Sequence, residues 1–190
     1  MNTEKSLIIY FSNSGYTKKL AKELSRNINC DIEELKTPVS YSGFFGYQRA
    51  MFHAIFGKAP EIKKLKHNPA NYDLVIIGGP LWAGSTSGPV RAFLVEYKNL
   101  IRNISFFTTQ GGPYGKKQLF LQMEEICGKK PIACLSVTDK SLNENDFQQS
   151  VWTFLNELQK NIAKTIGINP PKIEYQIPQK RATHEQQTLH

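Results

Sequence analysis

Three hydroxyl side chains and a glycine follow the first apolar run of the chain. Ser12, Ser14 and Thr17 offer hydroxyl donors within six positions, and Gly15 lacks the side chain that would keep a ligand away from the backbone. Backbone N–H groups at the start of a helix bind an anion without help from lysine or arginine. These residues predict a phosphate-binding turn, whereas a helix cap alone would need only Ser14. The predicted turn consists of Ser12, Asn13, Ser14, Gly15, Tyr16 and Thr17.

The residues on either side of this turn predict a strand and a helix. Residues 7–11 form an uninterrupted apolar run, which is typical of a strand buried on both faces of a parallel sheet. From Lys18 onward the period changes, and apolar residues recur three or four positions apart, at Leu20, Ala21, Leu24 and Ile28. This spacing predicts a helix that begins at Lys18 and lays its apolar face on the sheet.

The turn resembles a loop of a known family. Its sequence, Ser-Asn-Ser-Gly-Tyr-Thr, is similar to the Ser/Thr-x-Ser/Thr-Gly-x-Thr loop of flavodoxin-like proteins, which holds the phosphate of FMN. The resemblance extends over residues 6–165, because further similar segments follow in the order that the family has them. It implies that FMN is the cofactor of this chain.

The rest of the chain alternates between strand and helix patterns. After the first strand, the pattern predicts further strands at 31–35, 74–77, 104–107 and 132–137, with helical apolar faces between and after them. Strands that alternate with helices predict an α/β fold with a doubly wound five-stranded parallel sheet and helices on both faces. The flavodoxin-like strand order 2-1-3-4-5 is the leading topology.

Two further polar, glycine-containing loops are predicted after the third and fourth strands. Ligands of doubly wound sheets bind beyond the carboxyl ends of the strands, at the point where the strand order reverses. Both loops would therefore lie beside the predicted phosphate turn. One contributes Pro80, Leu81, Trp82, Ala83 and Gly84, and the other contributes Thr108, Thr109, Gln110, Gly111, Gly112 and Tyr114.

The family resemblance implies roles for these two loops. It places Trp82 beside the isoalloxazine ring of FMN and lets residues 108–112 line the other side, with Tyr114 as a candidate second aromatic. The chain departs from the family because its second loop lacks the usual aspartate. No catalytic residue and no metal ligand is assigned.

Composition and charge bound the kind of protein. With 190 residues the chain is long enough for one domain, and it contains neither an apolar run that could span a bilayer nor a secretory signal, so we expect a cytoplasmic protein. Cys30, Cys127 and Cys134 lack metal-ligand spacing and are expected to be reduced. We predict a flavodoxin-like domain at 1–168 and an extended tail rich in proline and glutamine at 169–190.

A basic segment interrupts the otherwise balanced charge. Six lysine or arginine residues and a single acidic residue lie between Lys36 and Lys66, and the net charge of the whole chain is +8. This excess either forms a solvated face or attracts anionic partners. The aromatic residues of the same segment are expected to pack in the core, with a role in membrane or partner contact as the alternative.

The resemblance implies an FMN-binding redox protein, and two activities stay open. One is electron transfer with a redox partner protein, and the other is NAD(P)H-dependent reduction of small quinone-type acceptors. The alternative is a flavodoxin-fold binding module without redox activity that acts through the basic segment or the tail. The chain carries no nucleic-acid motif, and a homodimer stays open. If FMN binds, the positive charge predicts a milder reductant than in an acidic flavodoxin.

Overall fold

The computed structural model describes residues 5–166, except for 39, 42, 44–45, 47, 50–51 and 53–55. The predicted tail at 169–190 lies outside the described residues. Seven apolar residues of the basic segment were expected to pack in the core, and five of them also lie outside the described residues: Phe44, Phe45, Tyr47, Met51 and Ile55. The other two, Phe52 and Phe56, are exposed, and their rings lie 4.7 Å apart. Among the described residues no helix combines the length and the apolar character needed to cross a membrane.

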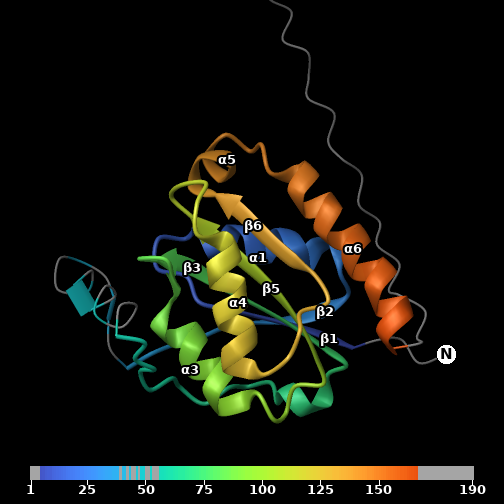
Figure 1. The fold of residues 1–190 in the computed structure, drawn as a ribbon, viewed down its shortest axis with the longest axis horizontal. Helices are drawn as coiled ribbons and strands as arrows, with labels where there is room; N and C mark the ends of the chain where they lie inside the picture. The colour runs from blue at the N-terminus through green and yellow to red at the C-terminus, as the bar shows by residue number, and fades with distance from the viewer. Residues whose placement is uncertain are drawn as a thin grey trace, which may run out of the picture.

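Five parallel strands form the centre of the molecule (Figure 1). They are β1 (Ser6–Tyr10), β2 (Cys30–Glu34), β3 (Leu74–Trp82), β5 (Asn103–Gln110) and β6 (Cys134–Thr138), in the order β2-β1-β3-β5-β6. This is the predicted order. A sixth strand that the sequence did not indicate, β4 (Ser85–Thr86), folds back and pairs antiparallel with the end of β3.

Helices cover both faces of the sheet (Figure 1). They are α1 (Tyr16–Asn27), α3 (Gly88–Tyr97), α4 (Lys116–Cys127), α5 (Asp139–Asn143) and α6 (Gln148–Ile166), with a 3-10 turn η1 (Pro69–Asn71) before β3. The apolar residues of α3 and α4 pack on one face, and those of α1, α5 and α6 pack on the other. The sheet therefore lies between two helical layers, which confirms the predicted α/β class.

The central strands are buried on both faces. Leu7 and Ile9 of β1 belong to the core under α3 and α4, whereas Ile8 and Tyr10 belong to the core under α1 and α6. This alternation explains why residues 7–11 form an unbroken apolar run, because a strand covered on both sides needs apolar residues at every position.

Two strands are longer than the sequence indicated. β3 runs on through residues 78–82 and β5 through residues 108–110, all of which were predicted as loops. The glycines at the middle of β3 are explained by packing: a Cβ atom on Gly78 would overlap the ring of Phe107, and one on Gly79 would lie 2.6 Å from Val90. Glycine here permits close approach of neighbouring layers and does not mark a turn.

Candidate functional site

The sheet register brings the predicted site segments to one edge. Tyr10 of β1 lies opposite Gly78 of β3, and Pro80 of β3 lies opposite Thr109 of β5. The residues that follow β1, β3 and β5 therefore meet at the carboxyl edge of the sheet, where ligands of this architecture bind. The reversal of strand order between β1 and β3 falls at the same place.

The predicted phosphate turn has free backbone donors. Gly15 is the N-cap of α1 with φ of 92°, and no atom lies within 4 Å of the position that a Cβ atom would take. Within the described part of the chain, the N–H groups of residues 12–17 donate to no protein acceptor, whereas the Lys18 N–H donates to Ser12 Oγ at 3.2 Å. Residues 13–15 are exposed. This turn can therefore surround an anion with several amides at the positive end of a helix.

The hydroxyl of Thr17, the last residue of the turn, is buried, unlike the exposed residues 13–15. Thr17 is 1% exposed, and its Oγ1 lies 2.8 Å from Oγ1 of Thr109 at the end of β5. The structure therefore directs this hydroxyl to the interior, where it connects the first turn of α1 to the third site segment. Thr108 is also engaged, because its hydroxyl donates to the carbonyl of Gly79 at 2.9 Å. Helix α1 begins at Tyr16, two residues before the predicted start.

Trp82 belongs to an aromatic cluster beside the turn. Its ring centroid lies 5.7 Å from that of Phe11 and 5.4 Å from that of Tyr41, and the Phe11 and Tyr41 rings are 5.5 Å apart. Burial raises the pKa of Tyr41 to about 12, so its hydroxyl is neutral at ordinary pH. Trp82 itself remains partly exposed, which leaves surface for a flat ligand.

A tight hairpin holds Trp82 in position. Ala83 and Gly84 connect β3 to β4 with φ of 45° and 75°, the positive values that a type I′ turn requires at both central residues. The far side of the hairpin is fixed to α4, because Gln122 Oε1 accepts hydrogen bonds from Ser85 Oγ at 2.8 Å and from the Thr86 N–H at 2.9 Å. The hairpin that carries Trp82 is therefore fixed to α4 by hydrogen bonds, which holds Trp82 in position.

The end of β5 presents a buried acceptor. Gln110 is 4% exposed, and its Oε1 has no hydrogen-bond partner among the described residues. A buried amide oxygen without a donor is costly, and a ligand N–H group at this edge would satisfy it. The following residues Gly111 and Gly112 are exposed, and Tyr114 is 85% exposed, while the next residue, Gly115, lies against the Leu81 side chain of the second loop.

The structure adds a fourth segment that the sequence did not indicate. Because Gln110 lies opposite Thr138, the start of α5 follows next to Gly111, and Asp139 Oδ2 lies 4.0 Å from the position of a Cβ atom there. Burial raises the pKa of Asp139 above its usual range. Helix α5 has only five residues and no helical repeat, which is why sequence periodicity could not find it.

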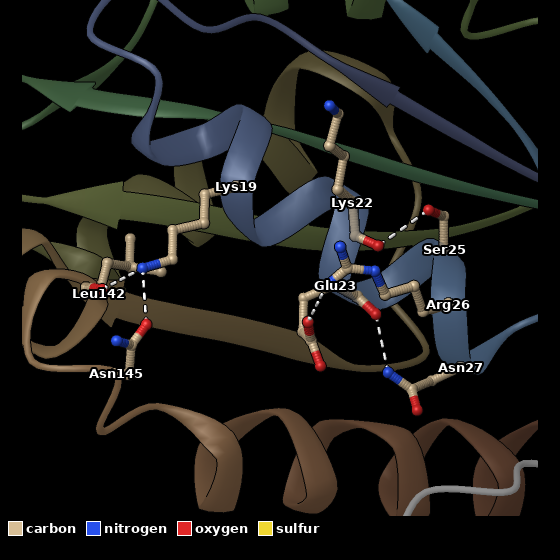
Figure 2. Close-up of polar contacts among 8 residues, drawn as sticks. All are labelled: Lys19, Lys22, Glu23, Ser25, Arg26, Asn27, Leu142 and Asn145. Atoms are coloured by element: carbon tan, nitrogen blue, oxygen red, sulfur yellow. Dashed lines mark hydrogen bonds and ion pairs between the residues drawn. The ribbon is translucent and has the colours of Figure 1, made fainter.

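Helix α5 also holds the start of α1. Lys19 Nζ donates to the Leu142 carbonyl at 2.5 Å and to Asn145 Oδ1 at 2.8 Å, and Figure 2 shows this side chain reaching across from α1 to that segment. Asn143 Nδ2 donates to the Tyr16 hydroxyl at 3.0 Å. The start of α1 is therefore fixed by the α5 segment as well as by Thr109.

The cysteines and acidic groups do not suggest metal or thiol chemistry. Burial raises the pKa of Cys30 and of Cys134 to about 12, so neither is a thiolate at neutral pH. No cluster of three metal-ligating side chains is found in the described ranges. The site is instead a cradle of amides, aromatic rings and one unsatisfied amide oxygen, which suits a phosphorylated planar ligand.

These features define a class of doubly wound α/β proteins with a phosphate cradle at the switch point, and sequence comparison gives the family. The chain belongs to the flavodoxin family: a family model described as Flavodoxin matches residues 5–157. No curated protein sequence matches the chain.

Solved structures agree with this assignment. A flavoprotein in complex with FMN from Lactobacillus acidophilus NCFM is 26% identical, with a TM-score of 0.60, and the match covers 75% of this chain and 98% of that one. A flavoprotein from Bacteroides uniformis, described as putative, has a TM-score of 0.61 at 16% identity, with coverage of 76% and 97%. One from Bacteroides eggerthii has 0.58 at 18% identity, with coverage of 78% and 98%. The latter two likenesses show the fold alone.

Proposed function

We propose that this protein binds FMN at the carboxyl edge of its sheet and works as a redox flavoprotein. The observation that carries the proposal is the set of backbone N–H groups at residues 12–17, which have no acceptor among the described residues and surround an open glycine at a helix start. Free amides in this arrangement bind a phosphate dianion. The similar flavoprotein from Lactobacillus acidophilus is described as a complex with FMN.

The residues present fit each part of FMN. The amides and the hydroxyls of Ser12 and Ser14 would hold the phosphate, and Trp82 would lie beside the ring. Gln110 Oε1 would accept from a ring N–H group, which would remove an unsatisfied buried acceptor. Thr17 would act indirectly, by fixing the turn to Thr109. When bound, FMN supplies transfer of one or two electrons, and the protein supplies binding and orientation.

Two physiological roles remain within this proposal, and one experiment separates them. An electron carrier exchanges electrons rapidly with a partner protein, whereas a reductase oxidises NAD(P)H in the steady state when a quinone is present. We favour neither. Reduced thiols at Cys30, Cys127 and Cys134 fit a reducing compartment such as the cytoplasm.

Reconstitution tests the proposal directly. The purified full chain is titrated with FMN and with riboflavin, which has the same ring but no phosphate. We expect a stable yellow complex with FMN and much weaker binding of riboflavin, because the amide cradle acts on the phosphate. A protein that stays colourless with saturating FMN would contradict the proposal, and the fold would then serve as a binding module. Equal affinity for both flavins would contradict the assigned phosphate site.

A further inference from the structure

A groove lined by lysines lies beside the phosphate turn. A cavity of about 470 Å³ lies at the end of β2, between this strand and residues 63–67, and four lysines contribute to its lining: Lys36, Lys63, Lys64 and Lys66. A smaller cavity of about 260 Å³ shares Lys36 and Lys63 with it and reaches Ser12 and Asn13 of the phosphate turn. The two cavities form one basic path, which we call the lysine groove.

The lysines of this groove have no acidic ion-pair partners within the described part of the chain. None of the four forms an ion pair with any residue that the structure describes, although two glutamates line the same cavity. Both glutamates are already engaged. Glu33 accepts from the N–H groups of Lys66 and His67 at 2.8 and 3.0 Å and contacts the His67 ring at 2.9 Å, and Glu34 pairs with Lys18 at 3.2 Å. Four lysines and two glutamates line the cavity, and one of these glutamates pairs with Lys18, so the lining keeps a net positive charge.

The backbone of the lysine groove is fixed. The Lys63 N–H donates to the Lys36 carbonyl at 2.7 Å, and the Glu33 carboxylate holds the main chain of residues 66 and 67. The four lysine side chains are exposed, so their ammonium groups are accessible to an anion that enters the groove. A fixed hollow lined by lysines that have no ion-pair partner in the described structure is suited to phosphate groups, for which lysine acts as a point charge.

We propose that the lysine groove binds a pyrophosphate-bearing small molecule, such as a nucleoside diphosphate or a dinucleotide. Four lysines along one path match two adjacent phosphates better than a single one. The volume lies within the range of about 300–1,000 Å³ that small-ligand pockets have, and a concave surface favours a small molecule over an acidic protein face. The larger cavity contains no residue of the FMN cradle, whereas the smaller one reaches the cradle at Ser12 and Asn13, so a redox-active dinucleotide held here would come close to the flavin. Only that last point rests on the proposed function.

The test uses the full chain, with and without FMN, and three probes: inorganic pyrophosphate, ADP and NADPH. The triple variant Lys63→Gln, Lys64→Gln, Lys66→Gln removes groove charge but keeps the backbone hydrogen bonds. The matched control Lys130→Gln, Lys160→Gln, Lys164→Gln removes the same charge from the loop before β6 and from α6, neither of which lines the groove. Calorimetric titration at low salt measures each dissociation constant.

We expect pyrophosphate to bind the wild type and the control equally, and the groove variant about tenfold or more weakly, since several phosphate contacts are lost. Binding of NADPH and ADP as well would identify a nucleotide ligand, and binding of pyrophosphate alone would identify a free anion; both support the site. Equal binding by the groove and control variants, or no binding of any probe, would overturn it. So would a groove variant that loses affinity for FMN but keeps its affinity for pyrophosphate, because the lysines would then serve the FMN phosphate. Failure of FMN to bind concerns the proposed function alone, since the apo protein is titrated too.

Discussion

The hydroxyl of Thr17 meets the hydroxyl of Thr109 at 2.8 Å, across 92 positions of sequence and out of contact with solvent. One group belongs to the first turn of α1 and the other to the end of β5. This bond joins two segments that we propose to hold opposite ends of one cofactor. Thr17 is consequently a positioning residue for the cradle.

We expect Thr17→Val to destabilise the fold by about 1–3 kcal/mol, because it leaves the buried Thr109 hydroxyl without a partner. The double variant Thr17→Val, Thr109→Val removes both groups and should lose less than the sum of the single changes. Denaturant unfolding of the four proteins gives the coupling energy. Additive losses would mean that the two hydroxyls do not interact.

The second prediction concerns Gly15, whose φ of 92° strains any other residue. We expect Gly15→Ala to cost about 1–2 kcal/mol of stability and to weaken FMN binding, since the methyl group enters the cradle. Gly128→Ala is the control, because Gly128 also has a positive φ, of 68°, with nothing within 4 Å, but ends α4 far from the turn. Similar loss of stability with normal FMN affinity is expected there. If both variants bind FMN equally, the turn is not the phosphate site.

Trp82 and Trp152 are the two tryptophans of the chain, which makes a fluorescence test possible. Trp82 lies in the aromatic cluster at the site, whereas Trp152 is 39% exposed on α6. We expect FMN to quench most of the emission of the Trp152→Phe variant, in which only Trp82 emits, and little of the emission of the Trp82→Phe variant. The reverse result would place the flavin ring elsewhere.

Tyr72 provides a pH test of stability. Its hydroxyl donates to Asp31 Oδ2 at 2.6 Å, and burial, with the hydrogen bond and charge of Asp31, raises its pKa to about 12 from the usual 10.0. This hydroxyl therefore stabilises the fold fully below pH 10 and stops doing so as pH rises through 12. We expect Tyr72→Phe to lower the free energy of unfolding by about 1 kcal/mol at neutral pH. The difference in stability from the wild type should disappear between about pH 10 and 12. Tyr114→Phe, at an exposed position, should leave the free energy of unfolding unchanged. If Tyr72→Phe stays less stable than the wild type above pH 12, the Tyr72 hydroxyl is not the group responsible.

A fifth prediction concerns the reduction potential of bound FMN. The net charge of +8 stabilises an anionic reduced flavin, so the protein should be a milder reductant than an acidic flavodoxin. Salt screens this field, and the potential should fall as ionic strength rises. Reductive titration at two salt concentrations measures both effects. A strongly negative potential that is independent of salt would refute the electrostatic explanation.

The sequence predicted the central strands because they are visible as apolar runs, such as residues 74–77, and their alternation with helices made the order 2-1-3-4-5 the leading topology. It did not predict that β5 continues through Gln110, since polar residues at a strand end look like a loop. A loop was predicted around Ala83 and Gly84, but not the tight hairpin that they form, because alanine rarely takes a positive φ. Contacts such as Thr17 with Thr109 depend on register between distant strands, which no local pattern contains.

The start of α1 is anchored to two separate segments, by Thr109 of β5 and by the carbonyl of Leu142 in α5. A phosphate turn whose backbone is already held in place loses little conformational entropy when FMN binds. The observed rate constant of FMN binding should therefore rise in proportion to FMN concentration. It should reach no plateau, because no slow rearrangement limits binding. The protein would thus bind FMN in a preorganised site, without a conformational change on binding.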